Sequence, residues 1–180
     1  MILQDLEVEE ILSLKDAGIS VDIDENGATF EENALIKVQA LRPYADEDTV
    51  ILADDSGLVI DALNGEPGIY SARYMGEDTS YDIKNANLIE RLNGLVGAER
   101  SARFVCVIAA SFPDGSTKTC EGTMEGIIAD APAGENGFGY DPILFLPEYN
   151  MTSAQISPEE KNAISHRGKA LRAMRKTLMK

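Results

Sequence analysis

The 180-residue sequence is poor in residues that build many common sites: it has no tryptophan, one histidine and two cysteines. A single histidine excludes a zinc site built from several histidines. Cys106 and Cys120 form no CxxC pair, so we expect buried free thiols, although their spacing alone leaves a disulfide open. No apolar run approaches the ~18 residues of a membrane-spanning helix, and no basic segment leads into an apolar export signal. These absences predict a cytoplasmic protein with no membrane partner.

Positive charge is also scarce: the sequence has 16 basic and 31 acidic residues, which gives a formal net charge of −15. Nucleic-acid polymers and anionic membranes are held by broad basic surfaces, so neither is an expected partner. A single nucleotide remains compatible with this charge, since it needs only a few local cations or a metal ion. The length fits one domain that spans residues 1–180.

The stretch from Thr49 to Tyr74 carries adjacent acids beside an apolar run. Val50–Ala53 is typical of a buried strand, which we expect to stop at Asp54. Side chains alternate along a strand, so Asp54 and Asp55 should face opposite ways and only one can serve a given site. The sequence DDSG is equally typical of a simple turn.

The remaining pattern alternates helices with strands and predicts an α/β fold with a mixed sheet. A capping box from Thr29 to Glu32 predicts a helix that runs to about Leu41. The other predicted elements are a helix from Thr79 or Ser80 to about Gly97, a long hairpin with arms 102–112 and 117–128, a short strand at 142–145 and a basic helix from Pro158 to the end of the chain. Gly122 and Gly126 in the second arm suggest bulges or bends.

Two segments near the C-terminus combine groups that could recognise a nucleotide. The loop AGENGFGY at residues 133–140 matches neither the phosphate-loop motif nor the dinucleotide fingerprint, but its rings at Phe138 and Tyr140 could stack on a base. The alternative is that an aromatic ring anchors the loop to the core. Further on, Ser165, His166 and Arg167 place the only histidine between a hydroxyl and a guanidinium. An isolated histidine is more often structural, so this interpretation depends on its neighbours.

Five segments of the sequence form a recognisable set: ENGATFEENALIK (Glu25–Lys37), ADDSGL (Ala53–Leu58), GEPGIYSARY (Gly65–Tyr74), GFGYDPI (Gly137–Ile143) and EEKNAISHRGKAL (Glu159–Leu171). Together they resemble the inosine triphosphate pyrophosphatase family, whose members hydrolyse non-standard purine nucleoside triphosphates such as ITP, dITP and XTP to the monophosphate and pyrophosphate. The resemblance covers nearly the whole chain in order.

The resemblance implies an elongated central sheet, a homodimer and a role for specific residues. Asp55 resembles the catalytic acid, which accepts a proton from water and helps to hold Mg²⁺, or Mn²⁺ in its place. Asp24 occupies the second metal position, with Glu25 as the adjacent candidate. The positions that resemble substrate-binding residues are Lys37 and Ser56 on the phosphate side, and Phe138, Gly139, Tyr140, Asp141, Lys161, His166 and Arg167.

The resemblance departs from the family at the start of the chain. The family opens with a strand and an Asn- and Lys-containing loop that holds the triphosphate, and this sequence begins to resemble it inside the first helix. We expect the missing segment to lie upstream of Met1, because the other motifs are intact. The alternative is a nucleotide-binding protein impaired in catalysis. A metal-dependent phosphatase with an aspartate nucleophile is a further, more generic alternative.

Overall fold

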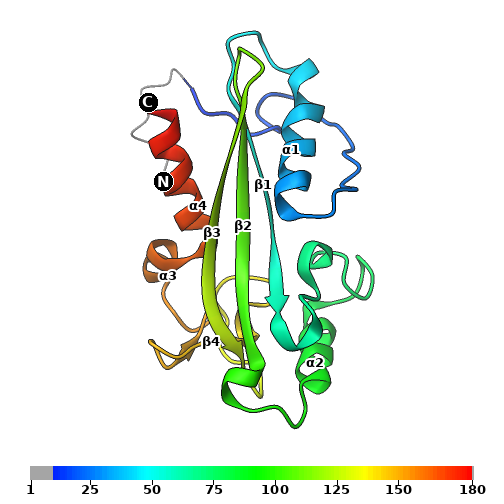
Figure 1. Ribbon diagram of the computed structural model, residues 1–180, viewed down its shortest axis with the longest axis vertical. Coiled ribbons are helices and arrows are strands. Elements are labelled where there is room, and N and C mark those ends of the chain that lie inside the picture. The colour runs from blue at the N-terminus through cyan, green and yellow to red at the C-terminus, as the bar shows by residue number, and fades with distance from the viewer. Residues whose placement is uncertain (1–9, 180) are drawn as a thin grey trace.

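A long twisted sheet forms the spine of the protein, which the computed structural model describes for residues 10–179 (Figure 1). Within this range five strands follow one another in chain order, and each neighbouring pair is antiparallel. The strands are β1 (Ile51–Ile60), β2 (Ser101–Ser111), β3 (Thr117–Ile128), β4 (Leu144–Leu146) and β5 (Met151–Thr152). The predicted α/β fold with an elongated sheet, a long hairpin and flanking helices is therefore confirmed. The prediction of a mixed sheet was wrong for residues 10–179, where all the strand pairs are antiparallel; β2 and β3, for example, are joined by a tight turn, which only antiparallel strands allow. The expectation about a first strand and phosphate loop concerns the start of the chain, outside the described residues.

Helices cover both faces of the hairpin, with α1 on one side and α4 on the other (Figure 1). Their cores differ because alternate residues of β2 face opposite ways. Val107 and Ala109 belong to the core under α1, whereas Cys106 and Ile108 belong to the core under α4. The helices are α1 (Phe30–Leu41), α2 (Tyr81–Arg91), α3 (Pro158–Ile164) and α4 (His166–Leu178). The prediction for α2 was too long, because the chain leaves the helix after Arg91 and turns at Gly94, whose φ is +87°, before a separate short 3-10 helix (Gly97–Arg100) begins.

The prediction that the first strand stops at Asp54 was wrong, because the strand continues through both aspartates. It runs from Ile51 to Ile60, and each residue pairs with β2, including Asp54 with Ile108 and Asp55 with Val107. The ladder to the long neighbouring strand outweighs the local turn preference of DDSG. The acids therefore lie in the middle of a rigid strand, which fixes the direction of each side chain.

The C-terminal segment forms two helices where one was predicted. Ser165 is in an extended conformation between them, and its hydroxyl accepts a hydrogen bond from the Gly168 amide at 3.0 Å as the cap of α4. No bulge interrupts the second hairpin arm at Gly122 or Gly126, since β2 and β3 pair in unbroken register. Gly122 instead gives room to the α4 backbone, because a Cβ there would collide with the carbonyl of His166. The start of α4 is thus held against the sheet.

Two further observations concern the cysteines and the membrane. Cys106 and Cys120 are both free, as predicted, but only Cys106 is fully buried, whereas Cys120 is partly exposed. No helix between residues 10 and 179 is long and apolar enough to cross a membrane.

Candidate active site

The two adjacent aspartates of β1 serve opposite faces of the strand, as alternation predicted. Asp55 faces α1, where its carboxylate accepts hydrogen bonds from Lys37 Nζ at 3.0 Å and Asn33 Nδ2 at 3.3 Å. Asp54 faces α4, where its Oδ2 accepts from Arg167 Nε at 3.1 Å and Nη2 at 2.9 Å. The strand therefore separates two sets of polar side chains. The acidic group, on the α1 side, contains Asp55, and the other set, on the α4 side, contains Asp54 and Arg167.

Lys37 joins two carboxylates on the α1 side of the strand. Its ammonium lies 3.0 Å from Asp55 Oδ1 and 3.0 Å from Glu25 Oε2. It also donates to the main-chain carbonyl of Asp54 at 3.0 Å. Asp24, the residue assigned by resemblance to the second metal position, is exposed, and its carboxylate accepts from Asn26. In this loop Glu25, rather than Asp24, is directed toward Asp55.

Asn33 fixes this arrangement, a role that the sequence patterns did not predict. Its side chain is fully buried in α1, and its Oδ1 accepts from the Gly27 amide at 2.9 Å while its Nδ2 donates to Asp55. One amide therefore ties the loop that carries Glu25 to the carboxylate of Asp55. An asparagine among the apolar positions of a helix is unusual, and that is the signal that could have identified it.

The carboxyl group of Asp55 is tuned by competing effects. Burial raises its pKa above the ordinary value, and the hydrogen bonds from Lys37 and Asn33 offset only part of that rise. Burial opposes the charge of Lys37 as well, but Asp55 and Glu25 together raise the pKa of its ammonium. Asp55 is consequently a better proton acceptor than an exposed aspartate, and a fixed cation lies beside it.

The position of the Lys37 ammonium shows that the carboxylates of Asp55 and Glu25 can bind a cation between them. Two carboxylate oxygens from different segments converge on one positive charge, and oxygen ligands are those that hard ions such as Mg²⁺ prefer. No cluster of three or more histidine, cysteine, aspartate or glutamate side chains with metal-site geometry occurs among the described residues. Asp55 and Glu25 thus provide two oxygen ligands, and the other ligands of such an ion would come from phosphate and water.

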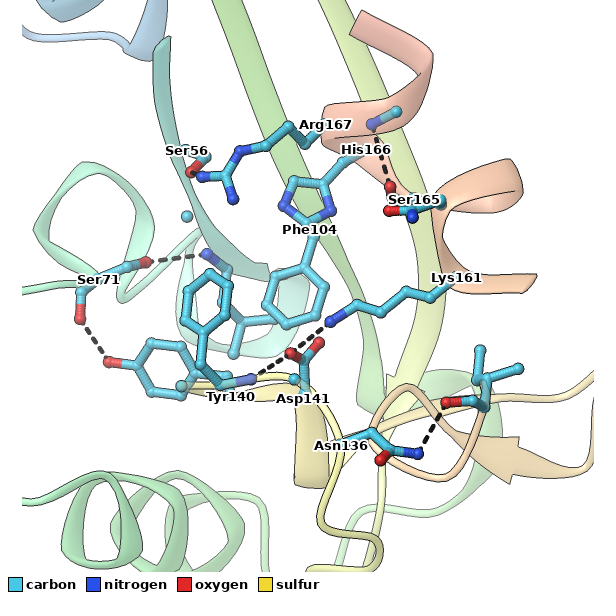
Figure 2. A pocket seen from close by; sticks show the side chains of 18 of the residues that line it. Ser56, Ser71, Phe104, Asn136, Tyr140, Asp141, Lys161, Ser165, His166 and Arg167 are labelled. Carbon is cyan, nitrogen blue, oxygen red and sulfur yellow. Dashed lines mark hydrogen bonds and ion pairs between the residues drawn. The ribbon is translucent and has the colours of Figure 1, made fainter. Parts of the chain in front are cut away.

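A pocket of about 420 Å³ opens on the other side of β1 (Figure 2). Its walls come from Ser56 on β1, the segment Ser71–Ala72, the loop 136–141 and the facing ends of α3 and α4. Every substrate-binding residue predicted from the resemblance lines it, with the exception of Lys37. This size matches a small-molecule site that encloses a large part of its ligand.

Asp141 organises the glycine-rich loop at the pocket rim. It is 3% exposed, and its carboxylate accepts from the Phe138 amide at 2.8 Å, from Ser153 Oγ at 2.7 Å and from Lys161 Nζ at 2.5 Å. Gly137 has a φ of +76°, and a Cβ there would collide with the Asp141 carboxylate. The carboxylate is therefore fully engaged in shaping the loop.

The two rings of the loop have different roles. Phe138 is 67% exposed at the rim, where Lys161 Nζ and Arg167 Cζ lie 5.8 and 5.9 Å from the centre of its ring. It offers an open face for stacking. Tyr140 is 4% exposed, and its hydroxyl donates to the Ser71 carbonyl at 2.6 Å. The Tyr140 ring anchors the loop, which corresponds to the structural alternative considered for these aromatic residues.

His166 and Arg167 project from the first turn of α4 toward the pocket (Figure 2). The imidazole stacks on Phe104, with 5.0 Å between ring centres, and its buried Nδ1 has no hydrogen-bond partner within residues 10–179. Burial, assisted by the charge of Arg167, lowers the pKa of His166 to about 4, so the ring is neutral at pH 7. Arg167 also donates to Ser56 Oγ at 3.3 Å. These side chains present both neutral and cationic polar groups to a ligand.

Comparison with known proteins identifies the family of this chain. The sequence matches the Ham1 family over residues 1–177. The dITP/XTP pyrophosphatase of Clostridium perfringens is 48% identical over 93% of this chain and 84% of its own length, and that of Geobacillus kaustophilus is 49% identical over 90% and 78%.

Solved structures give the same relationship. The Ham1 protein of Staphylococcus aureus has a TM-score of 0.80 and 48% identity, with 88% of this chain and 81% of that chain covered. The HAM1 protein of Coxiella burnetii has a TM-score of 0.86 and 42% identity over 99% and 89%. The resemblance found in the five sequence segments is therefore confirmed, and the chain belongs to the Ham1 family.

Proposed function

We propose that this protein hydrolyses non-standard purine nucleoside triphosphates, such as ITP, dITP and XTP, to the monophosphate and pyrophosphate, and so removes them from the nucleotide pool. The observation that carries the proposal is the division of β1: Asp55 serves the acidic group, and the next residue, Ser56, lines the pocket. A nucleotide bound with its base in the pocket would bring its phosphates to the same part of the strand. The names of the relatives, dITP/XTP pyrophosphatases, support this substrate class.

In this reaction Asp55 accepts the proton of the attacking water. Its raised pKa favours proton uptake, and the strand holds the carboxylate in one direction. Lys37 offsets the phosphate charge that would repel the nucleophile. Asp55 and Glu25 would hold Mg²⁺, or Mn²⁺, and the ion when bound would neutralise phosphate charge and orient the phosphoryl group. Asp24 has no part in this proposal because its carboxylate lies with Asn26.

The choice of base follows from the donors at the pocket. Inosine and xanthosine carry a carbonyl at the six position, whereas adenosine carries an amino group there. Arg167 and Lys161 offer donors beside the open face of Phe138. These cations can pair with a carbonyl oxygen, but they would leave an amino group without an acceptor. ATP is therefore expected to be a poor substrate.

Pyrophosphate release from ITP, XTP, GTP and ATP with Mg²⁺ tests the proposal. We expect release from ITP and XTP, little from ATP, and no orthophosphate unless an inorganic pyrophosphatase is added. Orthophosphate as the direct product would instead indicate a phosphatase. Binding of ITP in calorimetry without turnover would identify a nucleotide-binding protein that lacks catalysis.

The same proposal includes a homodimer in the cytoplasm. The free thiols of Cys106 and Cys120 suit a reducing compartment, and the family resemblance supports the dimer. Light scattering coupled to size-exclusion chromatography should give about twice the mass of one 19.5 kDa chain. A monomer at micromolar concentration would contradict the dimer without affecting the proposed reaction.

A further inference from the structure

The first turns of α2 contain a buried cation for which the reaction proposed above gives no reason. Lys84 is 1% exposed, and no carboxylate of residues 10–179 forms an ion pair with it. A buried charge without a counter-ion is costly, and a position near the start of a helix adds to that cost. The ring of Tyr81, 4.8 Å from the ammonium, offsets part of it. Because the buried charge is costly, we infer that the contact made by the Lys84 ammonium has a role in this protein.

Lys84 contacts a wall of the pocket. Its Nζ donates to the main-chain carbonyl of Ala72 at 2.7 Å, and Ala72 lines the pocket together with Ser71. The Ser71 hydroxyl in turn accepts a hydrogen bond from the Leu58 amide on β1 at 2.9 Å. The segment Ser71–Ala72 is therefore held both by β1 and by Lys84.

The neighbouring residue holds a second wall. Asn85 is 2% exposed, and its Nδ2 donates to the carbonyl of Gly139 at 3.1 Å. Because a trans peptide is planar, this bond also fixes the N–H of Tyr140 on the side opposite to Asn85. Gly139 has a φ of +66°, a conformation that glycine adopts without strain, and the bond from Asn85 holds its peptide in that one arrangement.

The two walls also contact each other. The Tyr140 hydroxyl donates to the Ser71 carbonyl, and the rings of Tyr81 and Tyr140 pack edge to face with 5.1 Å between ring centres. Figure 2 shows Ser71 and Tyr140 side by side at one end of the pocket. Residues three and four apart on a helix share one face, so Tyr81, Lys84 and Asn85 act on the same end.

We propose that Lys84 and Asn85 are positioning residues that set the spacing of the two pocket walls and thereby the selectivity for the purine base. Neither side chain lines the pocket, so each acts through the main chain that it holds. The proposal rests on the nucleotide function proposed above. It predicts that their loss affects base recognition more than the chemical step at Asp55.

Three variants test this proposal: Lys84→Met, which keeps the length of the side chain without its charge, Asn85→Ala, and Ile83→Ala as the control. Ile83 lies on the same helix but is 55% exposed. For Lys84→Met and Asn85→Ala we expect KM for ITP to rise about tenfold, as for outer residues that orient a site. We expect kcat to stay within about twofold and the preference for ITP over ATP, as a ratio of kcat/KM, to fall about tenfold. Ile83→Ala should match the wild type.

Thermal melting and calorimetric binding of ITP separate the possible outcomes. Unchanged KM and base preference in both variants, with an active wild type, would overturn the positioning role alone. Equal losses on every substrate, in step with a loss of native structure, would reduce both residues to a structural role. Asn85→Ala removes no charge and decides the question if Lys84→Met does not fold. A wild type that neither binds nor hydrolyses ITP would overturn the proposed function itself.

Discussion

The two adjacent aspartates of β1 should have separable roles, because the strand directs them to opposite faces. Replacement by asparagine keeps the shape of each side chain and removes its charge. Asp55→Asn removes the proton acceptor, and general bases typically contribute about 10²- to 10⁴-fold. We therefore expect kcat for ITP to fall by that factor, which corresponds to about 3 to 5 kcal/mol of barrier.

Asp54→Asn should have a smaller and different effect. The variant loses the negative charge that accepts two hydrogen bonds from Arg167. Both side chains of this pair are about two-fifths exposed, at 41% and 42%, so solvent screens the interaction and its loss costs about 1 kcal/mol. That energy corresponds to about a fivefold change in an equilibrium constant. We expect it in KM, since Arg167 faces the base pocket, with kcat little changed.

Steady-state pyrophosphate release at saturating and at low ITP distinguishes the two variants. Melting curves at pH 7 show whether either substitution disturbs the fold. Burial raises the pKa of Asp55, so its ionised form is disfavoured in the folded state, and Asp55→Asn should not lower stability through loss of that charge. A kcat for Asp55→Asn within tenfold of the wild type, or a larger kcat loss for Asp54→Asn, would refute the assignment.

Three other predictions concern pH, packing and metal. The pKa of His166 is lowered from 6.5 to about 4, so the unfolded chain takes up a proton first as the pH falls. Wild type should therefore lose about 3 kcal/mol more stability than His166→Gln between pH 7 and pH 4, measured by urea unfolding; parallel losses would contradict this. Gly122→Ala forces a methyl group into the α4 backbone and should lower stability by about 2 kcal/mol in the same assay, whereas an unchanged midpoint would show that α4 can move aside. Glu25→Gln should raise the Mg²⁺ concentration needed for half-maximal activity about tenfold and Asp24→Asn should not, and the reverse order would restore Asp24 as the ligand.

Local sequence rules succeeded where neighbouring residues decide the structure. As predicted, the Thr29 hydroxyl caps α1 by accepting a hydrogen bond from the Glu32 amide at 3.1 Å, and the helix ends at Leu41. Even so, Glu32 accepts from the Ala28 amide and not from Thr29, a detail set by the incoming loop. The same rules failed at Asp54, where turn-forming residues lie inside a strand because β2 supplies a complete ladder.

The sequence by itself determined the family and the α/β class and named candidate site residues, because motif residues and capping signals are local patterns. Only the tertiary structure decided how these groups work. It directed Glu25 toward Asp55 through Lys37, engaged Asp141 in the loop, and placed Lys84 and Asn85 behind two walls of the pocket. Such contacts join residues far apart in the chain, and burial then sets their charge state and partners, which local patterns do not encode.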